Sequence, residues 1–342
     1  MANGTVHVSV FGKTDLGRTR DHNEDTFLVA DLSRRVSSLQ PDMREHEVGP
    51  RGSLFMVADG MGGAAAGEVA SRMAADAVFS HMSSVWPEDN EISAQRFAYR
   101  MKEAVELANN RIHTHAREHP EVRGMGTTAT VAGIFGSDLY LAQVGDSRAY
   151  LVRNGEITQI TKDQSLMQRL VEAGEITEEE AEQSERRNII LQALGPDPRV
   201  KVDLTRQSLR KGDLLVLCSD GLSGQVKKEE IAEVAAGTPE LMDLCARLID
   251  LANERGGPDN ITAIAARFGG SGLGEPDGGA GVGHEVYPLT EAEATTEPVP
   301  VYTGSPAPVP LPKPQPQPRW LLVGLVTLLA VALGIYLLFG QG

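Results

Sequence analysis

The stretch FMVADGMGGAAAG, residues 55–67, places one carboxylate, Asp59, between an apolar run and a loop of glycine and alanine. The run LFMVA before it has the length and composition of a buried strand. A glycine-rich loop after a strand can cradle a phosphate group, but this loop has no lysine and Asp59 would repel that anion. A carboxylate there suits a metal ion, and the glycines would let backbone carbonyls approach it.

Three more aspartates share this context. Asp146 ends LYLAQVG, Asp220 follows LLVLCS, and Asp259 comes just before ITAIAARF. Any one of them alone is typical of a turn, but four together favour a cluster at the ends of neighbouring strands. Two carboxylates about 4 Å apart repel by about 4 kcal/mol at an effective dielectric constant of about 20, so such a cluster needs cations. Oxygen ligands without histidine or cysteine favour Mg²⁺ or Mn²⁺ over zinc.

A charged segment near the N-terminus, RDHNEDTF, supplies Arg20, Glu24 and Asp25 just before another expected strand. One interpretation is a solvated charged turn. The other is that Glu24 joins the metal cluster while the guanidinium of Arg20 forks onto a substrate phosphate.

The body of the chain mixes short apolar runs with a few longer helical segments. Asn154 and Gly155, between RAYLVR and EITQIT, predict a tight hairpin, because this pair tolerates the positive φ angles of a type I′ turn. Helical periodicity covers residues 64–82 and 92–118, and a further helix is expected in 239–253. Strands in runs, with two long helices inserted together, predict an α+β sandwich. The polar, acidic segment 163–195 predicts short surface helices that can move. The expected strands are VHVSVF, TFLVA, LFMVA, TTATVAGIF, LYLAQV, RAYLVR, DLLVLCS and ITAIAARF.

The net charge bears on possible binding partners, and the cysteines bear on the cellular compartment. The formal net charge of -15 and the absence of a basic patch argue against nucleic acid as a partner. Cys218 and Cys245 lie in apolar settings without metal-type spacing, which favours buried thiols and a reducing compartment.

The C-terminal part differs from the body, since eleven of the nineteen prolines follow residue 269. Residues 269–318 have the composition of a disordered linker, whose last part, 306–318, favours a stiff polyproline spacer. Residues 320–339 form a 20-residue uncharged run, long enough as a helix to span a bilayer. Lys313 and Arg319 precede this run and no basic residue follows it, which places the body in the cytoplasm. No cleaved signal peptide is expected at the N-terminus.

Taken together, six motifs resemble, in order and spacing, those of the metal-dependent serine/threonine protein phosphatases, the type 2C or PPM family. The resemblance covers about residues 4–268 and is greatest to the compact bacterial members. It implies a four-layer α-β-β-α sandwich of antiparallel sheets flanked by helix pairs, with two Mn²⁺ or Mg²⁺ ions bridged by a water or hydroxide. The motifs are RDHNEDTF, VADGMGG, GTTATV, VGDSRAYL, CSDGLSG and GGPDNITAI.

The resemblance also implies a role for each site residue. Asp59 would bridge both ions, and Arg20 would bind the substrate phosphate. Asp146, with help from Asp220, would form a third, weaker metal site. Glu24 and the Gly60 carbonyl would bind one ion, and Asp220 and Asp259 would bind the other. Asp25 would stand behind these ligands without binding an ion directly.

Three positions depart from the family pattern, one in the glycine-rich loop and two in the segment 163–195. Met61 stands where some relatives have a histidine thought to protonate the leaving group, so our hypothesis for the donor is a metal-bound water near Asp146. Gln164 stands where many relatives have histidine, within Asp163-Gln164-Ser165, and Ser184-Glu185 replaces a frequent His-Pro. These changes concern the segment 163–195 and substrate choice. The insert 34–51 has no functional assignment.

The sequence therefore predicts a phosphoprotein phosphatase with three parts: the phosphatase domain 4–268, the linker 269–318 and a single transmembrane helix 320–339 in the cell membrane. It would hydrolyse phosphoserine and phosphothreonine on proteins and oppose a serine/threonine kinase. One alternative is a weakly active or regulatory domain of the same fold that binds phosphoproteins at the membrane. Another, a dinucleotide-dependent enzyme, needs an acidic residue about twenty positions after the glycine loop, but Asp76 lies within a helical pattern.

Overall fold

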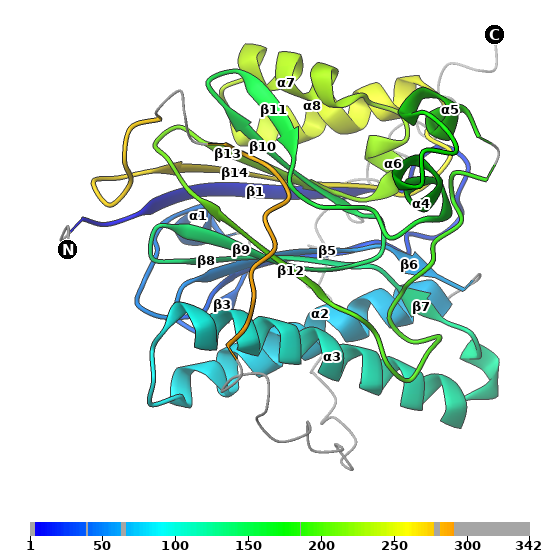
Figure 1. Ribbon diagram of the computed structural model, residues 1–342, viewed down its shortest axis with the longest axis horizontal. Helices are drawn as coiled ribbons and strands as arrows, with labels where there is room; N and C mark the ends of the chain where they lie inside the picture. Colours follow the sequence, from blue (N-terminus) through cyan, green and yellow to red (C-terminus); the bar gives the residue numbers. More distant parts are fainter. Residues whose placement is uncertain (1–3, 39, 63–65, 185, 277–280, 291–342) are drawn as a thin grey trace, which may run out of the picture. The chain divides into compact units, whose positions relative to one another are not determined.

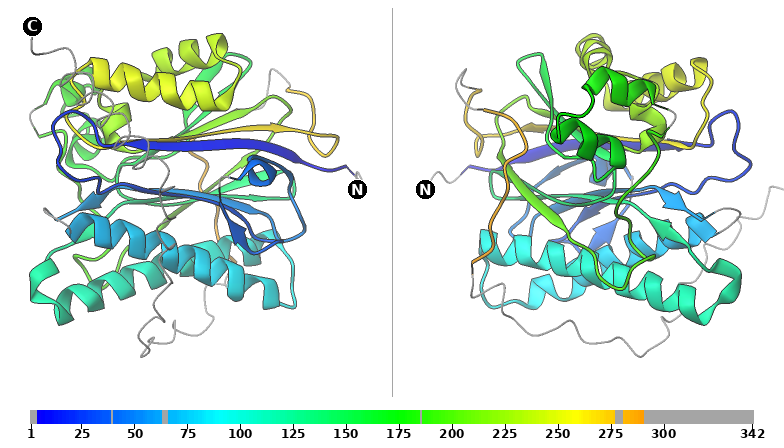
Figure 2. Two further views of the ribbon diagram at one scale, coloured as in Figure 1. Left: turned by 180° about the vertical axis from the view of Figure 1, so that it is seen from behind. Right: turned by 45° about the vertical axis from the view of Figure 1, so that its right-hand side comes forward.

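The computed structural model describes residues 4–290 except 39, 63–65, 185 and 277–280. Two six-stranded antiparallel sheets pack face to face, and helices cover the outer face of each. Figure 1 shows α7 and α8 over one sheet and α2 and α3 under the other, and the turned views of Figure 2 show the same layers. The prediction of a four-layer α+β sandwich is therefore confirmed.

The first sheet has the strand order β11-β10-β13-β14-β1-β4. Asn154 and Gly155 connect β10 to β11 with φ angles of 53° and 82°, which confirms the predicted hairpin turn. Its strands are β1 (His7–Asp15), β4 (Glu45–Glu47), β10 (Arg148–Arg153), β11 (Glu156–Gln159), β13 (Leu214–Cys218) and β14 (Ile261–Gly269).

The second sheet has the strand order β12-β9-β8-β5-β2-β3, and a two-stranded sheet, β6 with β7, extends from its end. The strands are β2 (Thr26–Asp31), β3 (Val36–Ser37), β5 (Ser53–Ala58), β6 (Gly60–Met61), β7 (Gly126–Thr127), β8 (Ala129–Phe135), β9 (Asp138–Val144) and β12 (Asp203–Ser208).

The helices α2, α3 and α8 fall where the periodicity predicts them, and the predicted short surface helices in the segment 163–195 are α4 and α5. Helix α7 was not predicted from the sequence. The helices are α1 (Pro41–Arg44), α2 (Ala66–Ser84), α3 (Ala94–Glu118), α4 (Leu166–Glu172), α5 (Glu178–Gln183), α6 (Asp220–Ser223), α7 (Lys228–Gly237) and α8 (Leu241–Glu254), with 3₁₀ turns η1 (Trp86–Glu88) and η2 (Pro120–Val122).

Strand β5, which leads into the glycine-rich loop after Asp59, is buried on both faces. Because side chains alternate along a strand, Phe55 and Val57 pack between the two sheets, while Leu54 and Met56 pack against α2 and α3. A third apolar cluster fills the space between the first sheet and α7 and α8, and it contains Cys218 and Cys245, both buried as predicted. The central strand is thus held from both sides, which fixes the residues that follow it.

The insert 34–51 crosses from one sheet to the other. Its β3 pairs with β2 at the edge of the second sheet, and its β4 pairs with β1 at the edge of the first. The fully buried Met43 of α1 lies between these two strands along the chain. The insert therefore closes one side of the sandwich.

Part of the predicted linker packs on the body. Residues 281–290, called the strap below, run along the edge strand β12, where the Arg206 N–H donates to Glu285 O at 3.0 Å. The Tyr287 ring contacts Tyr140 edge to face at 5.3 Å between centroids. Gln95 of α3 then donates to Pro288 O at 3.1 Å. This stretch of the predicted linker differs from a disordered chain because its backbone and Tyr287 find partners on the sheet edge.

Within residues 4–290, in the parts that the structure describes, no helix is long and apolar enough to cross a membrane. The predicted spacer 306–318 and the predicted transmembrane run 320–339 lie outside the described residues.

Candidate metal centre

The predicted site residues meet at one end of the sandwich, where β6, α4 and α6 gather in Figure 1. Asp59 follows β5, Asp146 follows β9, and Asp220 follows β13. Asp25 and Asp259 precede strands that run the opposite way, so they reach the same end. Thr26 pairs with Ala58, which puts Asp25 beside Asp59.

The backbone of Asp59 is held by two threonines from the GTTATV motif. Its N–H donates to Thr128 Oγ1 at 2.9 Å, and its carbonyl accepts from Thr127 Oγ1 at 2.9 Å and from the Thr128 N–H at 2.8 Å. No role was predicted for these threonines, although the motif that contains them was visible in the sequence. With its backbone held in this way, Asp59 projects its carboxyl into the cluster from a fixed point.

The carboxyl of Asp25 is buried and held on one side only. Oδ2 accepts from Thr262 Oγ1 at 2.6 Å and from Ser219 Oγ at 2.7 Å, while Oδ1 has no hydrogen-bond partner among the described residues. Burial raises the pKa of Asp25 to about 7, against the effect of those two hydroxyls.

The pKa values of the Asp59, Asp146 and Asp220 carboxyls are raised as well in the absence of cations. Burial, and then the charges of Asp25 and the other acids, raises the pKa of Asp59 well above its usual value. Burial and the charge of Asp220 raise the pKa of Asp146 to about 8. The pKa of Asp220 is raised by burial and by Asp259. Asp146 Oδ1 is a second buried oxygen without a partner in the described part of the chain.

Glu24 and Arg20 border this cluster. Burial raises the pKa of Glu24, although Arg20 opposes the shift. Arg20 donates through Nη2 to Asp259 Oδ2 at 2.7 Å, and 49% of its side-chain surface is exposed. The Arg20 guanidinium therefore lies at the mouth of the site, where it can meet a ligand.

Gly60 and Gly67 leave room for Glu24. A Cβ at Gly60 would lie 2.5 Å from Glu24 O, and a Cβ at Gly67 would lie 2.7 Å from the Glu24 carboxyl carbon. Any larger residue would push Glu24 out of place, so the glycines allow the close approach that the loop composition predicts.

No three histidine, cysteine, aspartate or glutamate side chains within the described residues are arranged so that they could hold a metal ion as they stand. Asp259 Oδ2 is engaged by the Arg20 guanidinium. The donor set nevertheless fits hard divalent cations, because it consists of oxygens alone and leaves Asp25 Oδ1 and Asp146 Oδ1 without partners. Bound cations would satisfy those oxygens and remove the repulsion that raises the pKa values.

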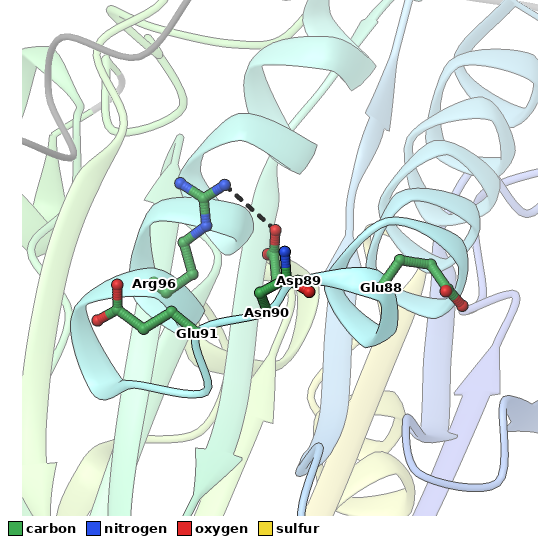
Figure 3. A pocket seen from close by; sticks show the side chains of 5 residues that line it. All are labelled: Glu88, Asp89, Asn90, Glu91 and Arg96. Carbon is green, nitrogen blue, oxygen red and sulfur yellow. Dashed lines mark hydrogen bonds and ion pairs between the residues drawn. The ribbon is translucent and has the colours of Figure 1, made fainter.

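A hollow of about 340 Å³ lies elsewhere, beside η1 and the start of α3 (Figure 3). It is lined by Glu88, Asp89, Asn90, Glu91 and Arg96. The 19 residues of α2, roughly 28 Å of helix, separate it along the chain from the glycine loop. Its central carboxylate, Asp89, is neutralised by Arg96 and Arg100, so this hollow offers no reactive group.

Met61 lies in β6, next to Gly60, and its thioether carries no proton to donate. The structure thus provides no donor at the position where the sequence pattern of some relatives has histidine.

Comparisons with known proteins agree with this geometry. The family model described as "Protein phosphatase 2C" matches residues 33–263. The serine/threonine protein phosphatase PstP of Mycobacterium tuberculosis is 39% identical over 266 residues, which cover 78% of this chain and 46% of that protein. The serine/threonine phosphatase stp of Listeria innocua is 36% identical over 253 residues, which cover 74% of this chain and 92% of that protein.

Among solved structures, the catalytic domain of PstP in complex with two manganese ions superposes with a TM-score of 0.63 at 36% identity. The match covers 78% of this chain and all of that domain. The matched part of this chain thus spans about half the length of full-length PstP and nearly all of the Listeria protein.

Proposed function

Because the chain belongs to the protein phosphatase 2C family, we propose that it hydrolyses phosphoserine and phosphothreonine on proteins with two Mn²⁺ or Mg²⁺ ions. The observation that carries the proposal is the group of buried, mutually repelling carboxyls at one end of the sandwich, with Arg20 at its mouth. Clustered carboxyls with raised pKa values are typical of functional sites, and cations that shared this site would compensate their charge. The complex of PstP with two manganese ions supports the same conclusion.

In this proposal Asp59 would be a ligand of both ions, and the charges of all the other aspartates of the cluster contribute to its raised pKa. Glu24 and the Gly60 carbonyl would hold one ion, and Asp220 and Asp259 would hold the other. Asp146, with Asp220, would hold a third ion more weakly. Asp25 would stand behind them, and its buried Oδ1 has no hydrogen-bond partner among the described residues.

When bound, the ions activate a water for in-line attack on phosphorus and offset the charge of the phosphoryl group. Arg20 holds the phosphate with the guanidinium that now pairs with Asp259. The backbone bonds from Thr127 and Thr128 keep Asp59 from moving as charge develops. The oxygen of the attacking water bonds to phosphorus as the ester P–O bond breaks, and a proton lost by that water ends on the departing serine or threonine oxygen. The products are the free alcohol and inorganic phosphate.

We propose further that residues 320–339 anchor the enzyme in the cell membrane with its domain in the cytoplasm, that the folded domain begins near residue 4, and that the linker ends near 318. The uncharged 20-residue run and the basic residues before it support the anchor. A phosphatase held there would oppose a serine/threonine kinase with targets at the same membrane.

The test measures phosphate release from a phosphothreonine peptide by the full chain, with Mn²⁺, with EDTA, and with the Asp59→Asn variant. We expect activity only with the metal and a loss on the order of a thousandfold in Asp59→Asn, since each 1.4 kcal/mol of lost stabilisation is about tenfold.

The matched control is Asp243→Asn, the same chemical change on an exposed position of α8, which should leave activity unchanged. A folded wild-type protein that releases no phosphate with either metal would contradict the proposal. That result would favour the alternative of a phosphoprotein-binding domain of the same fold.

A further inference from the structure

We propose that Gln164 is a positioning residue that fastens the flap segment, residues 163–195, to the backbone beside Asp146, so that the flap and the Asp146 carboxyl move together. The inference rests on the proposed phosphatase function, because it concerns a residue of the same site. Gln164 is neutral, and its side-chain amide is engaged at both ends.

The side-chain amide of Gln164 joins three separate pieces of chain. Its Oε1 accepts from the Gly145 N–H at 2.9 Å and from Gln192 Nε2 at 3.0 Å. Its Nε2 donates to Asp203 Oδ2, at the start of β12, at 3.0 Å. A primary amide both accepts two hydrogen bonds and donates, whereas a carboxylate only accepts. The amide thus links the end of β9, the returning arm of the flap and the edge strand.

The contact with Gly145 is two-sided, because the Gln164 N–H also donates to Gly145 O at 3.0 Å. Gly145 has a φ of 103°, and a Cβ there would lie 2.6 Å from the Thr128 side chain. This peptide is therefore clamped between Thr128 and Gln164.

The next residue is Asp146, whose Oδ1 is buried without a partner among the described residues. No neighbouring group among them holds that oxygen in place. The direction of the carboxyl therefore depends on the backbone that Gln164 clamps.

The other arm of the flap is attached to Gln164 as well. The Leu191 N–H donates to Gln164 O at 2.8 Å, and the Leu166 N–H donates to Ile189 O at 2.9 Å, so the two arms run side by side. Leu194 then exchanges two backbone hydrogen bonds with Thr127, at 3.1 and 2.8 Å, and Thr127 holds the Asp59 carbonyl. Both arms of the flap thus end on loops that carry acids of the cluster.

The outer part of the flap presents Ile189 and Leu191, which are 43% and 50% exposed. A substrate that contacts these side chains would act on the arm that Gln164 ties to Gly145. Displacement of the flap then shifts the Asp146 carboxyl, and a well-placed flap fixes it.

The experiment compares the full chain with Gln164→Ala and with the matched control Gln168→Ala. Gln168 lies in the same flap, and its side chain donates to Glu172 of the same helix at 2.9 Å. The first readout is hydrogen exchange of the peptide 187–194 in EDTA, which needs neither metal nor activity. We expect exchange about tenfold faster in Gln164→Ala, because the flap loses hydrogen bonds that close it.

The second readout is Mn²⁺ binding by calorimetry, and the third is kcat and KM on a phosphothreonine peptide. We expect the affinity of the weakest manganese equivalent and kcat to fall about tenfold in Gln164→Ala, the usual effect of removing a group that orients a metal ligand. Gln168→Ala should match the wild type in all three readouts.

A rescue separates positioning from general damage. Gln164→Glu places a carboxylate against the Asp203 carboxylate and should open the flap. In the double variant Gln164→Glu, Asp203→Asn, the new amide at position 203 can donate to the new carboxylate at position 164, so the hydrogen bond is restored with its direction reversed. We expect the double variant to recover the exchange rate and the manganese affinity.

A Gln164→Ala protein with faster flap exchange but wild-type manganese affinity and kcat would overturn the proposal, as would the absence of rescue. If the wild type released no phosphate, the proposed function would fail, yet exchange and manganese binding would still decide whether Gln164 couples the flap to Asp146.

Discussion

The carboxyls at the end of the sandwich and those between α2 and α3 differ in the charged groups that surround them, and the site carboxyls are the more deeply buried. The second group, here the paired cluster, contains His81, Asp89, Arg96, Arg100 and Glu103. Arg100 donates to both oxygens of Asp89, at 2.8 and 2.7 Å, and to Glu103 at 2.5 Å. Every acid in it faces at least one cationic or hydrogen-bonding partner.

The pKa values move in opposite directions in the two places. Burial alone would raise the pKa of Glu103, but hydrogen bonds from His81 and Arg100 outweigh it and lower that pKa to about 2. The pKa of Asp89 is also lowered, because Arg100 and Arg96 outweigh its burial. In the site, by contrast, burial raises the pKa of Asp25 to about 7.

The comparison distinguishes acids that stabilise the fold through ion pairs from acids that, under the proposed function, bind a ligand. Arginines compensate the paired cluster within the protein, so it stabilises the contact of α2 with α3 at neutral pH. In the site, burial outweighs the partners of Asp25, Asp59, Asp146 and Asp220, and under the proposed function cations would compensate these acids. The predictions below test that division, beginning with the largest expected change in stability.

The change Arg100→Ala should lower the free energy of unfolding by about 3 kcal/mol, because it removes the bidentate partner of Asp89 and a charged partner of the buried Glu103. Urea unfolding in the presence of Mn²⁺ measures the effect. The control is Arg35→Ala, which removes an exposed pair with Glu88 and should cost less than about 1 kcal/mol. Equal effects of the two changes would show that burial does not distinguish these ion pairs.

The stability of the metal-free protein should fall as the pH rises from about 5 to 8. An acid whose pKa is higher in the folded than in the unfolded state holds an extra proton between the two values, and the stability that this proton supplies is lost through that window. For Asp25 the window runs from 3.8 to about 7, and for Asp146 from 3.8 to about 8. If the folded state holds one proton more than the unfolded state over two pH units, the free energy of unfolding falls by about 2.7 kcal/mol across those units.

Thermal unfolding in EDTA across this pH range measures that decline. With Mn²⁺ the decline should be offset, because cations bind the deprotonated acids, so the gap in Tm between the two conditions widens with pH. A metal-free Tm that stayed level or rose over this range would show that the site acids are already ionised in the folded protein.

The sequence predicted the central part of the fold because its strands are buried and therefore apolar. Strand β5 and strand β14 appear as continuous hydrophobic runs, and the period of α3 is clear. Strand β12, with the sequence DLTRQS, gave no such signal, because an edge strand needs an apolar residue on one face only. The strap was predicted as linker, since its backbone contacts with β12 leave no pattern in composition.

In the site, too, some features could be predicted from the sequence and others could not. The aspartates could be grouped from sequence, because each lies at the end of an apolar run, and the structure brings them together. Their roles as ligands stay predictions. The contacts of Thr128 with Asp59 and of Gln164 with Gly145 could not be derived, because they join residues 69 and 19 positions apart whose pairing depends on the folded chain.

The change Asp59→Asn should raise the stability of the metal-free protein at pH 8 by about 1–2 kcal/mol. It removes the carboxyl that faces Asp25, Asp146 and Asp220 together, and its backbone bonds to Thr128 do not depend on the side chain. Urea unfolding in EDTA measures the effect. The control is Asp243→Asn, which removes a charge from the first turn of α8 and should lower stability by less than about 1 kcal/mol. A destabilised Asp59→Asn protein would place Asp59 with the acids of the paired cluster, which support the fold. A stabilised protein that has lost its activity would mean that the folded state keeps this repulsion for the sake of the metal centre.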